Sequence, residues 1–410
     1  MRRVAITGLG IICPIGNNRE EVWQSVLDGK CGIGPITRYD TAGRKVTLAG
    51  EVKHFNPDDF VDKRESRKMD LYTLYAMAAA VEAYKDAGLS SLSESHERWG
   101  TIVGSGIGGI GTIEEEKLRG EKAGYDRVSP YFIPKAISNM AAGNIAITYD
   151  LRGFCSCTVS ACASGANAIG DAARHIRDGY DDIMLAGGAE AAITTLSIGG
   201  FTSLHALTQA KDVTRASIPF DAERSGFVMG EGAGILVLEE YEHALKRGAK
   251  IYAMLSGYGA NCDAYHITAP RPDGSGAARC IKLAMEDAGI DAADVDYINA
   301  HGTSTKLNDS GETNAIKTVF GEDAKRLMVS STKSMTGHLL GASGAVEAVI
   351  TAMAVKEGFV PPTVNYRVPD PECDLDVVPC KGRKADIRYA LSDSFGFGGH
   401  NAVLVFGKER

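Results

Sequence analysis

Short apolar runs alternate with amphipathic runs along the whole chain. The apolar VAITGLG (4–10) precedes REEVWQSVLDG (19–29), whose apolar positions recur at helical spacing. Later, the helical SGANAIGDAARHIRDG (164–179) leads into the apolar DIMLAGGAE (182–190). Strands that alternate with helices are typical of layered proteins with buried sheets. The pattern therefore predicts the α/β fold class.

Part of this pattern occurs twice. Three pairs of similar segments follow one another in the same order: YKDAGL (84–89) and MEDAGI (285–290), ASGA at 163–166 and at 342–345, and GAGILVLEE (232–240) and HNAVLVFGK (400–408). The first pair closes helical runs with glycine, the second opens apolar helices, and the third is strand-like. The shared order argues against chance similarity of short alanine- and glycine-rich words. We infer a duplication whose halves cover residues 1–250 and 251–410.

The second ASGA helix has an unusual distribution of polar residues. SGAVEAVITAMAVKEG (343–358) is apolar nearly all round, with Glu347 as the exception. A helix without a polar face is usually enclosed by other layers of structure. Central helices between two sheets predict five layers in the order α-β-α-β-α.

Composition excludes several classes of protein. The chain of 410 residues has 44% hydrophobic and 23% charged residues, as ordinary soluble proteins do. Its formal net charge of −8 argues against a broad nucleic-acid surface. The basic run DKRESRK (62–68) is an exception. From the residues alone, a solvated loop or helix end explains this run better than a docking patch for an acidic partner.

The chain also lacks the signals of several other classes. Nine scattered cysteines include no C-x-x-C pair, and CSC (155–157) lacks a second ligand pair, so we expect neither a disulfide scaffold nor a metal site. No stretch approaches the length of a membrane span, and the first residues contain no cleavage pattern, so we expect a cytoplasmic protein. GLG (8–10) follows a strand, but Cys13 and Pro14 replace the rest of a dinucleotide-binding motif. We expect no cofactor.

Cys162 is the first candidate for chemistry. FCSCTVSA (154–161) is strand-like, and the helical segment after it stops at Gly179, so Cys162 lies at a strand-to-helix elbow. Backbone N–H groups and the helix dipole at such an elbow favour a thiolate and are expected to lower the pKa of the thiol. The same groups could stabilise an oxyanion. A buried, inert cysteine is equally compatible with this stretch.

Two histidines are candidate partners of this cysteine. His301 stands just beyond the strand-like VDYIN (295–299), where α/β folds place ligands. His338 lies five residues after Lys333 and just before the second ASGA helix. If the halves are duplicates, this helix and the Cys162 helix could face each other, and the three side chains would converge. A structural, hydrogen-bonded role for each histidine stays open.

Four segments together resemble one known family. They are SACASGANAIG (160–170), NAHGTSTKLND (299–309), STKSMTGHLLGASGAVEA (331–348) and DSFGFGGHNAVLVF (393–406). In identity and order they resemble the β-ketoacyl-acyl carrier protein synthases of the thiolase superfamily, most closely the elongating type II enzymes. The resemblance implies a duplicated, five-layered thiolase fold, a homodimer and acyl carrier protein as partner.

The resemblance also implies a mechanism. Cys162 would accept an acyl chain as a thioester, and malonyl-acyl carrier protein would then lose CO2 and attack that thioester. His301 and His338 would donate hydrogen bonds to the developing enolate oxygen. Lys333 would orient and tune His338, and the backbone N–H of Phe397 would be an oxyanion donor. The chain would thereby lengthen fatty acids by two carbons.

Further residues acquire roles from the same resemblance. Thr303 and Thr305 would bind the pantetheine arm, Ile107 and Phe201 would line the acyl tunnel, and Glu347 would support the lysine. Arg64, Arg67 and Lys68 would dock the acidic carrier protein, which reverses the interpretation of DKRESRK given above. His400 departs from the family pattern, because many relatives have threonine there.

The residues fit several other functions less well, and one stays open. A thiolase acting on CoA esters needs a second cysteine near the C-terminus, but Cys373 and Cys380 lie outside the glycine turn. A chain-length partner subunit lacks the nucleophile, and a cysteine hydrolase leaves the second histidine unexplained. A ketosynthase of a type II polyketide pathway shares most of these motifs and stays open.

Overall fold

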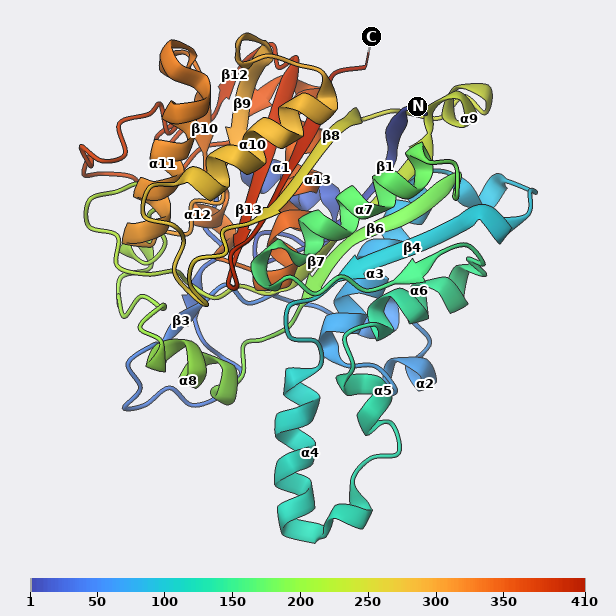
Figure 1. Cartoon of the computed structure of the whole chain (residues 1–410). Coiled ribbons are helices and arrows are strands. Elements are labelled where there is room, and N and C mark those ends of the chain that lie inside the picture. The colour runs from blue at the N-terminus through green and yellow to red at the C-terminus, as the bar shows by residue number, and fades with distance from the viewer. Residues whose placement is uncertain (1, 410) are drawn as a thin grey trace.

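The computed structural model describes residues 2–409 and contains one large mixed sheet with helices on both faces (Figure 1). Five strands come from the first part of the chain, in the spatial order β5-β4-β6-β7-β1. Their bounds are β1 (Val4–Ile12), β4 (Trp99–Gly104), β5 (Cys155–Ser156), β6 (Ile183–Glu190) and β7 (Gly232–Glu240). Strands β5, β4 and β6 run parallel, and β7 pairs antiparallel with both β6 and β1.

The later part of the chain repeats this arrangement. Its strands have the order β10-β9-β13-β14-β8. They are β8 (Ala253–Cys262), β9 (Val295–Asn299), β10 (Met328–Ser330), β13 (Tyr389–Gly396) and β14 (His400–Gly407). Strands β10, β9 and β13 run parallel, and β14 pairs antiparallel with both β13 and β8. The same order with the same directions confirms the predicted duplicated fold.

The two sets of strands meet where β1 lies beside β8. β1 and β8 pair antiparallel through Ala5↔Met254 and Ile6↔Ala253. This short ladder joins what the sequence indicated as two sheets into one ten-stranded sheet. The division of the chain near residue 250 stays a prediction.

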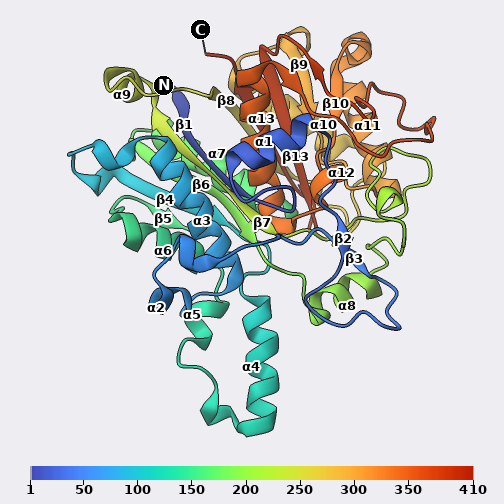
Figure 2. The same ribbon diagram turned by 180° about the vertical axis from the view of Figure 1, so that it is seen from behind.

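Helices form three layers around the strands (Figures 1 and 2). The central pair, α7 (Ser164–Arg177) and α13 (Ser343–Glu357), packs together between the two sets of strands. α3 (Leu71–Asp86) and α6 (Met140–Tyr149) cover the outer face of the first set, and α10 (Ser275–Ala288) and α11 (Lys306–Phe320) lie over the second. The α-β-α-β-α layering is therefore confirmed.

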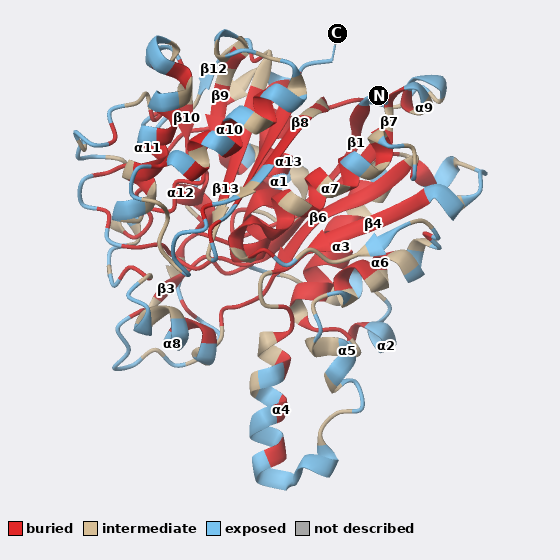
Figure 3. Cartoon of the chain, viewed as in Figure 1, coloured by how far each residue is buried: buried red, intermediate tan, exposed pale blue. Residues whose placement is uncertain are grey.

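Burial follows this layering (Figure 3). Every residue of α13 from Ser343 to Val355 is buried, including Glu347, as its nearly all-apolar sequence predicted. By contrast α7, which has polar residues on one side, buries only one face. Among residues 2–409, no helix combines the length and apolarity that crossing a bilayer requires.

Smaller elements surround this core. They are α1 (Arg19–Leu27), α2 (Lys63–Ser66), α4 (Ile110–Ala123), α5 (Phe132–Ala136), α8 (Thr195–Ser203), α9 (Tyr241–Lys246), α12 (Lys333–Thr336), β2 (Gly34–Pro35), β3 (Leu48–Ala49), β11 (Phe359–Val360) and β12 (Arg383–Lys384). Helices α4 and α5 form an arm that projects from the body (Figure 1). The strand expected over FCSCTVSA is shorter than predicted, because only Cys155 and Ser156 pair with β4, at the edge of the sheet.

The two ASGA segments touch each other at the centre of the molecule. A Cβ atom added to Gly165 would lie 2.9 Å from the carbonyl oxygen of Gly341 and 3.0 Å from the nitrogen of Ala345. A Cβ added to Gly344 would lie 2.9 Å from the nitrogen of Ala166. The repeated small residues therefore let the central helices approach backbone to backbone.

Gly344→Ala is expected to destabilise the protein. The new methyl group has no room between the central helices, and overpacking of this kind costs about 1–3 kcal/mol. Gly199→Ala is the matched control, because Gly199 is also helical but nothing lies within 4 Å of an added Cβ. Urea unfolding should show a lower free energy of unfolding for Gly344→Ala alone. Equal stability of the two variants would contradict the tight contact.

Candidate active site

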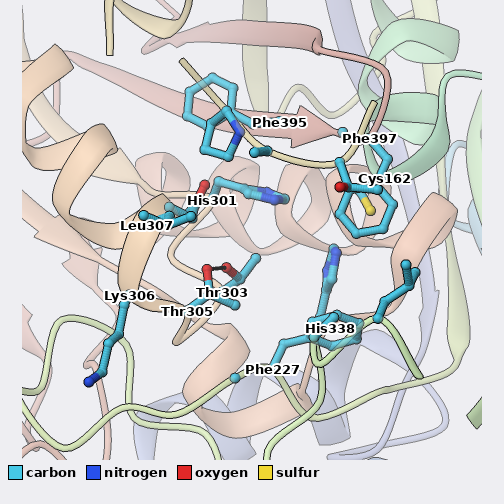
Figure 4. Close-up of a pocket in the computed structure, with 18 of the residues that line it drawn as sticks. Cys162, Phe227, His301, Thr303, Thr305, Lys306, Leu307, His338, Phe395 and Phe397 are labelled. Atoms are coloured by element: carbon cyan, nitrogen blue, oxygen red, sulfur yellow. Dashed lines mark hydrogen bonds between the residues drawn. The ribbon is translucent and has the colours of Figure 1, made fainter. Parts of the chain in front are cut away.

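One cavity of about 610 Å³ brings together side chains that are far apart in the sequence (Figure 4). Cys162, His301 and His338 all line it. Four other predicted site residues also line it, namely Phe201, Thr303, Thr305 and Phe397. The other predicted site residues do not line it, namely Lys333, Glu347, Ile107, Arg64, Arg67 and Lys68.

A short turn presents Cys162. Residues Ala161–Ala163 form a single 3₁₀ turn that leads into α7, and Ala161 has a positive φ of 51°. Such a conformation is costly for a residue with a Cβ atom, so the surrounding contacts must hold it. The Ser164 hydroxyl accepts the N–H of Ser160 at 2.9 Å and donates to the carbonyl of Ala161 at 2.6 Å. The predicted helix start beside Cys162 is therefore present and braced, but no strand leads directly into it, because β5 ends at Ser156.

The environment of the thiol differs from the expectation based on the elbow. Cys162 is only 8% exposed, and burial raises its pKa to about 12. The positive charge of Lys333 and a hydrogen bond from the backbone N–H of Phe397 act in the opposite direction but do not overcome burial. The sequence suggested a lowered pKa because it could not show how much water the sulfur loses. Deprotonation at neutral pH therefore requires a base.

His301 lies just beyond the carboxyl end of β9. The Glu312 carboxylate, on α11, accepts the backbone N–H of His301 at 2.7 Å and that of Gly302 at 2.8 Å. Phe395 packs edge-on against the imidazole, with ring centroids 5.6 Å apart. These contacts hold the ring in the cavity wall.

His338 reaches the cavity from the other side. Its backbone N–H donates to the carbonyl of Val228 at 2.7 Å, and its Nδ1 lies 2.8 Å from the Ser343 hydroxyl. Phe227 packs edge-on against its ring at 5.1 Å. The imidazoles of His301 and His338 are 5.2 Å apart and nearly perpendicular.

Both imidazoles are neutral at physiological pH. Burial holds the pKa of His301 and of His338 well below its usual range, and the charge of Lys333 lowers both further. A neutral imidazole has one N–H donor and one nitrogen acceptor. The pair can thus donate hydrogen bonds to a substrate oxygen or accept the proton of a thiol.

Lys333 is a buried cation among carboxyl groups. It forms an ion pair with Glu347 of α13, and both side chains are almost fully enclosed. Burial raises the pKa of Glu347 to about 7, although Lys333 opposes this shift. Neither carboxyl oxygen of the nearby Asp393 has a hydrogen-bond partner among residues 2–409, and burial raises its pKa well above the usual range. The lysine therefore acts on the site through its field, without lining the cavity.

Apolar and hydroxyl groups complete the walls. The hydroxyls of Thr303 and Thr305 lie 3.0 Å apart, where the chain enters α11 (Figure 4). Phe201, from α8, packs on Phe227 and near Phe397. Ile107 borders the apolar cluster that contains Cys162. One side of Cys162 thus meets apolar side chains.

The basic segment lies away from this cavity. Arg64 belongs to α2 and Arg67 follows it, and none of the three predicted docking residues lines the cavity. Lys68 pairs with Glu65 at 2.6 Å, whereas Arg64 and Arg67 have no ion pair within the described part of the chain. In both Figure 1 and Figure 2, α2 and α8 lie on opposite sides of the molecule.

Some side chains that contact the two histidines carry no signal in the sequence. Glu312, Ser343 and Phe395 each contact a histidine, yet none stands at a spacing that indicates it. Buried Glu190 accepts the backbone N–H groups of Gly106 at 2.8 Å and Gly341 at 3.0 Å, which ties the two halves together. His400, the departure noted in the sequence, is exposed. Residues 2–409 contain no cluster of three or more histidine, cysteine or acidic side chains suited to a metal ion.

The raised pKa of Cys162 has a measurable consequence. Because alkylation requires the thiolate, the rate of iodoacetamide labelling at Cys162 should rise roughly tenfold per pH unit from pH 8 to 10. Free cysteine, with a pKa of about 8.5, should level off within that range and provides the reference. Peptide mass spectrometry follows the label at this residue. A plateau below pH 9 would mean that the elbow lowers the pKa after all.

Comparisons with known proteins agree with this geometry. Residues 1–244 match the family Beta-ketoacyl synthase, N-terminal domain, and residues 252–367 match Beta-ketoacyl synthase, C-terminal domain. The chain is 52% identical over 407 residues to 3-oxoacyl-[acyl-carrier-protein] synthase 2 of Staphylococcus aureus (strain COL), covering 99% of this chain and 98% of that protein. The identity is also 52%, over 408 residues, with the protein of the same name from Synechocystis sp., with the same coverage.

Solved structures show the same likeness. A β-ketoacyl synthase from Burkholderia phymatum has a TM-score of 0.91 at 37% identity, with 100% of both chains covered. A chain from the complex of a type II PKS acyl-carrier protein with its ketosynthase has a TM-score of 0.92 at 39% identity, also with 100% of both chains covered. Fold, cavity and sequence similarity together establish that this chain belongs to the β-ketoacyl synthase family.

Proposed function

We propose that this protein is a 3-oxoacyl-[acyl carrier protein] synthase that condenses malonyl-acyl carrier protein with an acyl group held on Cys162. The observation that carries the proposal is the meeting of one buried cysteine with two neutral imidazoles in a single cavity. The names of the relatives at 52% identity support the carrier protein as the substrate carrier.

The first stage transfers the acyl group. The sulfur of Cys162 attacks the thioester carbonyl of the acyl carrier, the bond to the pantetheine sulfur breaks, and the thiol proton passes through a neutral imidazole to that leaving sulfur. The backbone N–H of Phe397 already bonds to the cysteine sulfur, so it lies beside the carbonyl that forms there. The acyl chain then extends toward the apolar cluster that contains Cys162 and that Ile107 and Phe201 border.

The second stage forms the new carbon–carbon bond. Malonyl-acyl carrier protein replaces the first carrier, with its pantetheine arm beside Thr303 and Thr305. Breaking its carbon–carboxylate bond releases CO2 and leaves an enolate, whose oxygen receives hydrogen bonds from His301 and His338. The enolate carbon attacks the acyl carbonyl, the bond to Cys162 breaks, and the released thiolate takes up a proton from water. Because both carriers use one cavity in turn, the kinetics are ping-pong.

A homodimer is part of the proposal. Strand β5 forms one edge of the sheet, and apolar side chains beside it, Ile147, Phe154 and Val159, are exposed. An exposed apolar surface at a sheet edge is suited to a second copy of the chain.

A ketosynthase of a type II polyketide pathway is the second candidate. The 39% identity to a ketosynthase that acts with a type II PKS carrier protein supports it. The higher identity, 52%, to proteins named 3-oxoacyl-[acyl-carrier-protein] synthase 2 favours fatty acid elongation.

The function is tested with purified acyl carrier protein. Wild-type protein should gain one acyl mass on Cys162 and, with malonyl carrier, form one 3-oxoacyl product per primer and then stop. Cys162→Ala should gain no acyl mass, because the nucleophile is missing. Mass spectrometry of enzyme and carrier measures both. A missing adduct on wild-type protein would exclude the mechanism, and repeated extension of the unreduced product would favour polyketide synthesis.

Arg64→Glu is expected to weaken carrier binding. Reversing this charge should raise KM for acyl carrier protein several-fold, with kcat nearly unchanged, because electrostatic steering acts on encounter. Arg279→Glu makes the same charge change at an exposed position of α10 and serves as the matched control. Steady-state kinetics at low and high salt measure the effect. Equal KM values for the two variants would show that carrier protein docks elsewhere.

A further inference from the structure

The two ASGA segments place a serine at the first position of each central helix, Ser164 in α7 and Ser343 in α13. Each hydroxyl oxygen accepts the backbone N–H of the residue four positions earlier, that of Ser160 at 2.9 Å and that of Leu339 at 2.8 Å. The duplicated serines therefore share one structural role. Each closes the turn that begins its helix.

The two hydroxyl protons go to different acceptors. Ser164 donates to the backbone carbonyl of Ala161 at 2.6 Å, within its own turn. In the second half the acceptor position is taken by a catalytic candidate, because Nδ1 of His338 lies 2.8 Å from the Ser343 hydroxyl. The hydroxyls of the two equivalent serines thus form a hydrogen bond with a backbone carbonyl in one half and with an imidazole in the other.

The direction of this second hydrogen bond follows from the surroundings. Ser343 is 0% exposed, so water does not reach its hydroxyl. One lone pair already receives the N–H of Leu339, and within the described chain Nδ1 of His338 is the only recorded acceptor for the hydroxyl proton. If Nδ1 carried the proton, the buried hydroxyl proton would have no partner, which is costly. Nδ1 therefore accepts, and the proton of the neutral ring is on Nε2.

His301 is not constrained in this way. Its Nδ1 is buried and has no hydrogen-bond partner among residues 2–409. The ring of His338 points toward Cys162 and His301 in the cavity (Figure 4). Of the two imidazoles, His338 is thus the one whose tautomer the protein determines.

We propose that Ser343 is a positioning residue that holds His338 in the Nε2–H tautomer, so that this ring always offers a donor to the substrate oxygen. The proposal rests on the condensing function proposed above and assigns different duties to the two histidines. His338 is a committed donor, whereas His301 is free to accept the thiol proton during acyl transfer. Neither duty requires a change of charge on His338.

The tautomer can be read without any activity. In protein with ¹³C-labelled histidine, the Cδ2 chemical shift of His338, identified by its loss in His338→Ala, distinguishes the two neutral forms. Wild-type protein should show the Nε2–H form. Ser343→Ala should show a mixture of both forms, and Ser343→Thr, which keeps a hydroxyl, should restore the wild-type signal.

Kinetics supply the second readout. In Ser343→Ala, kcat for malonyl decarboxylation and condensation should fall about tenfold with KM nearly unchanged, because a donor is lost in the transition state but not in binding. Ser164→Ala is the matched control for stability and for the His338 signal, since it loses the equivalent helix-start contacts without touching an imidazole; because Ser164 braces the turn of Cys162, the kcat of this variant is not used as a reference. It should lower the unfolding temperature as much as Ser343→Ala does, and it should leave the His338 signal unchanged.

Two results would overturn the proposal. One is an Nδ1–H form of His338 in the wild-type protein, a measurement that needs no variant to fold. The other is an unchanged His338 signal in Ser343→Ala. If the signals behave as expected but wild-type protein condenses nothing, the tautomer assignment stands and the proposed function fails. The two ideas are therefore separable.

Discussion

The contact between the two central helices is the constraint on which the rest of the structure depends. α7 and α13 meet where Gly165 faces Gly341 and Gly344 faces Ala166, with no room for further atoms. This approach puts the start of one helix against the start of the other. Cys162 lies at the first start and His338 just before the second, so close packing of small residues brings the thiol and an imidazole into one cavity.

The duplicated elbow shows how one motif acquired two uses. Ala161 and Leu340 occupy equivalent positions, and both have positive φ angles, 51° and 48°. The next residue is Cys162 in the first half and Gly341 in the second. The cysteine presents a thiol to the cavity, whereas the glycine permits the close approach and donates its N–H to Glu190. The symmetry of the backbone is thus retained while the side chains diverge.

Burial and the charge of Lys333 act together on the protonation of the site. Lys333 is surrounded by Glu312, Glu347 and Asp393, and its field lowers the pKa of both histidines while it opposes the rise at Cys162. Desolvation is nevertheless the larger effect on each group. The resting site therefore holds a thiol and two neutral rings, a combination that suits donation to an oxygen and transfer of a proton.

The sequence by itself determined the fold class and the buried character of α13, because both follow from the local periodicity of apolar residues. It also determined the duplication and the small residues at the start of both central helices, because short similar segments recur in the same order. It also indicated Cys162, His301 and His338 as candidates. Only the tertiary structure decided the direction of the Cys162 pKa, the pairing of β1 with β8, and the contacts of Glu312 and Ser343 with the histidines. Desolvation and contacts between distant segments depend on what surrounds a residue in space, and linear spacing carries no record of that.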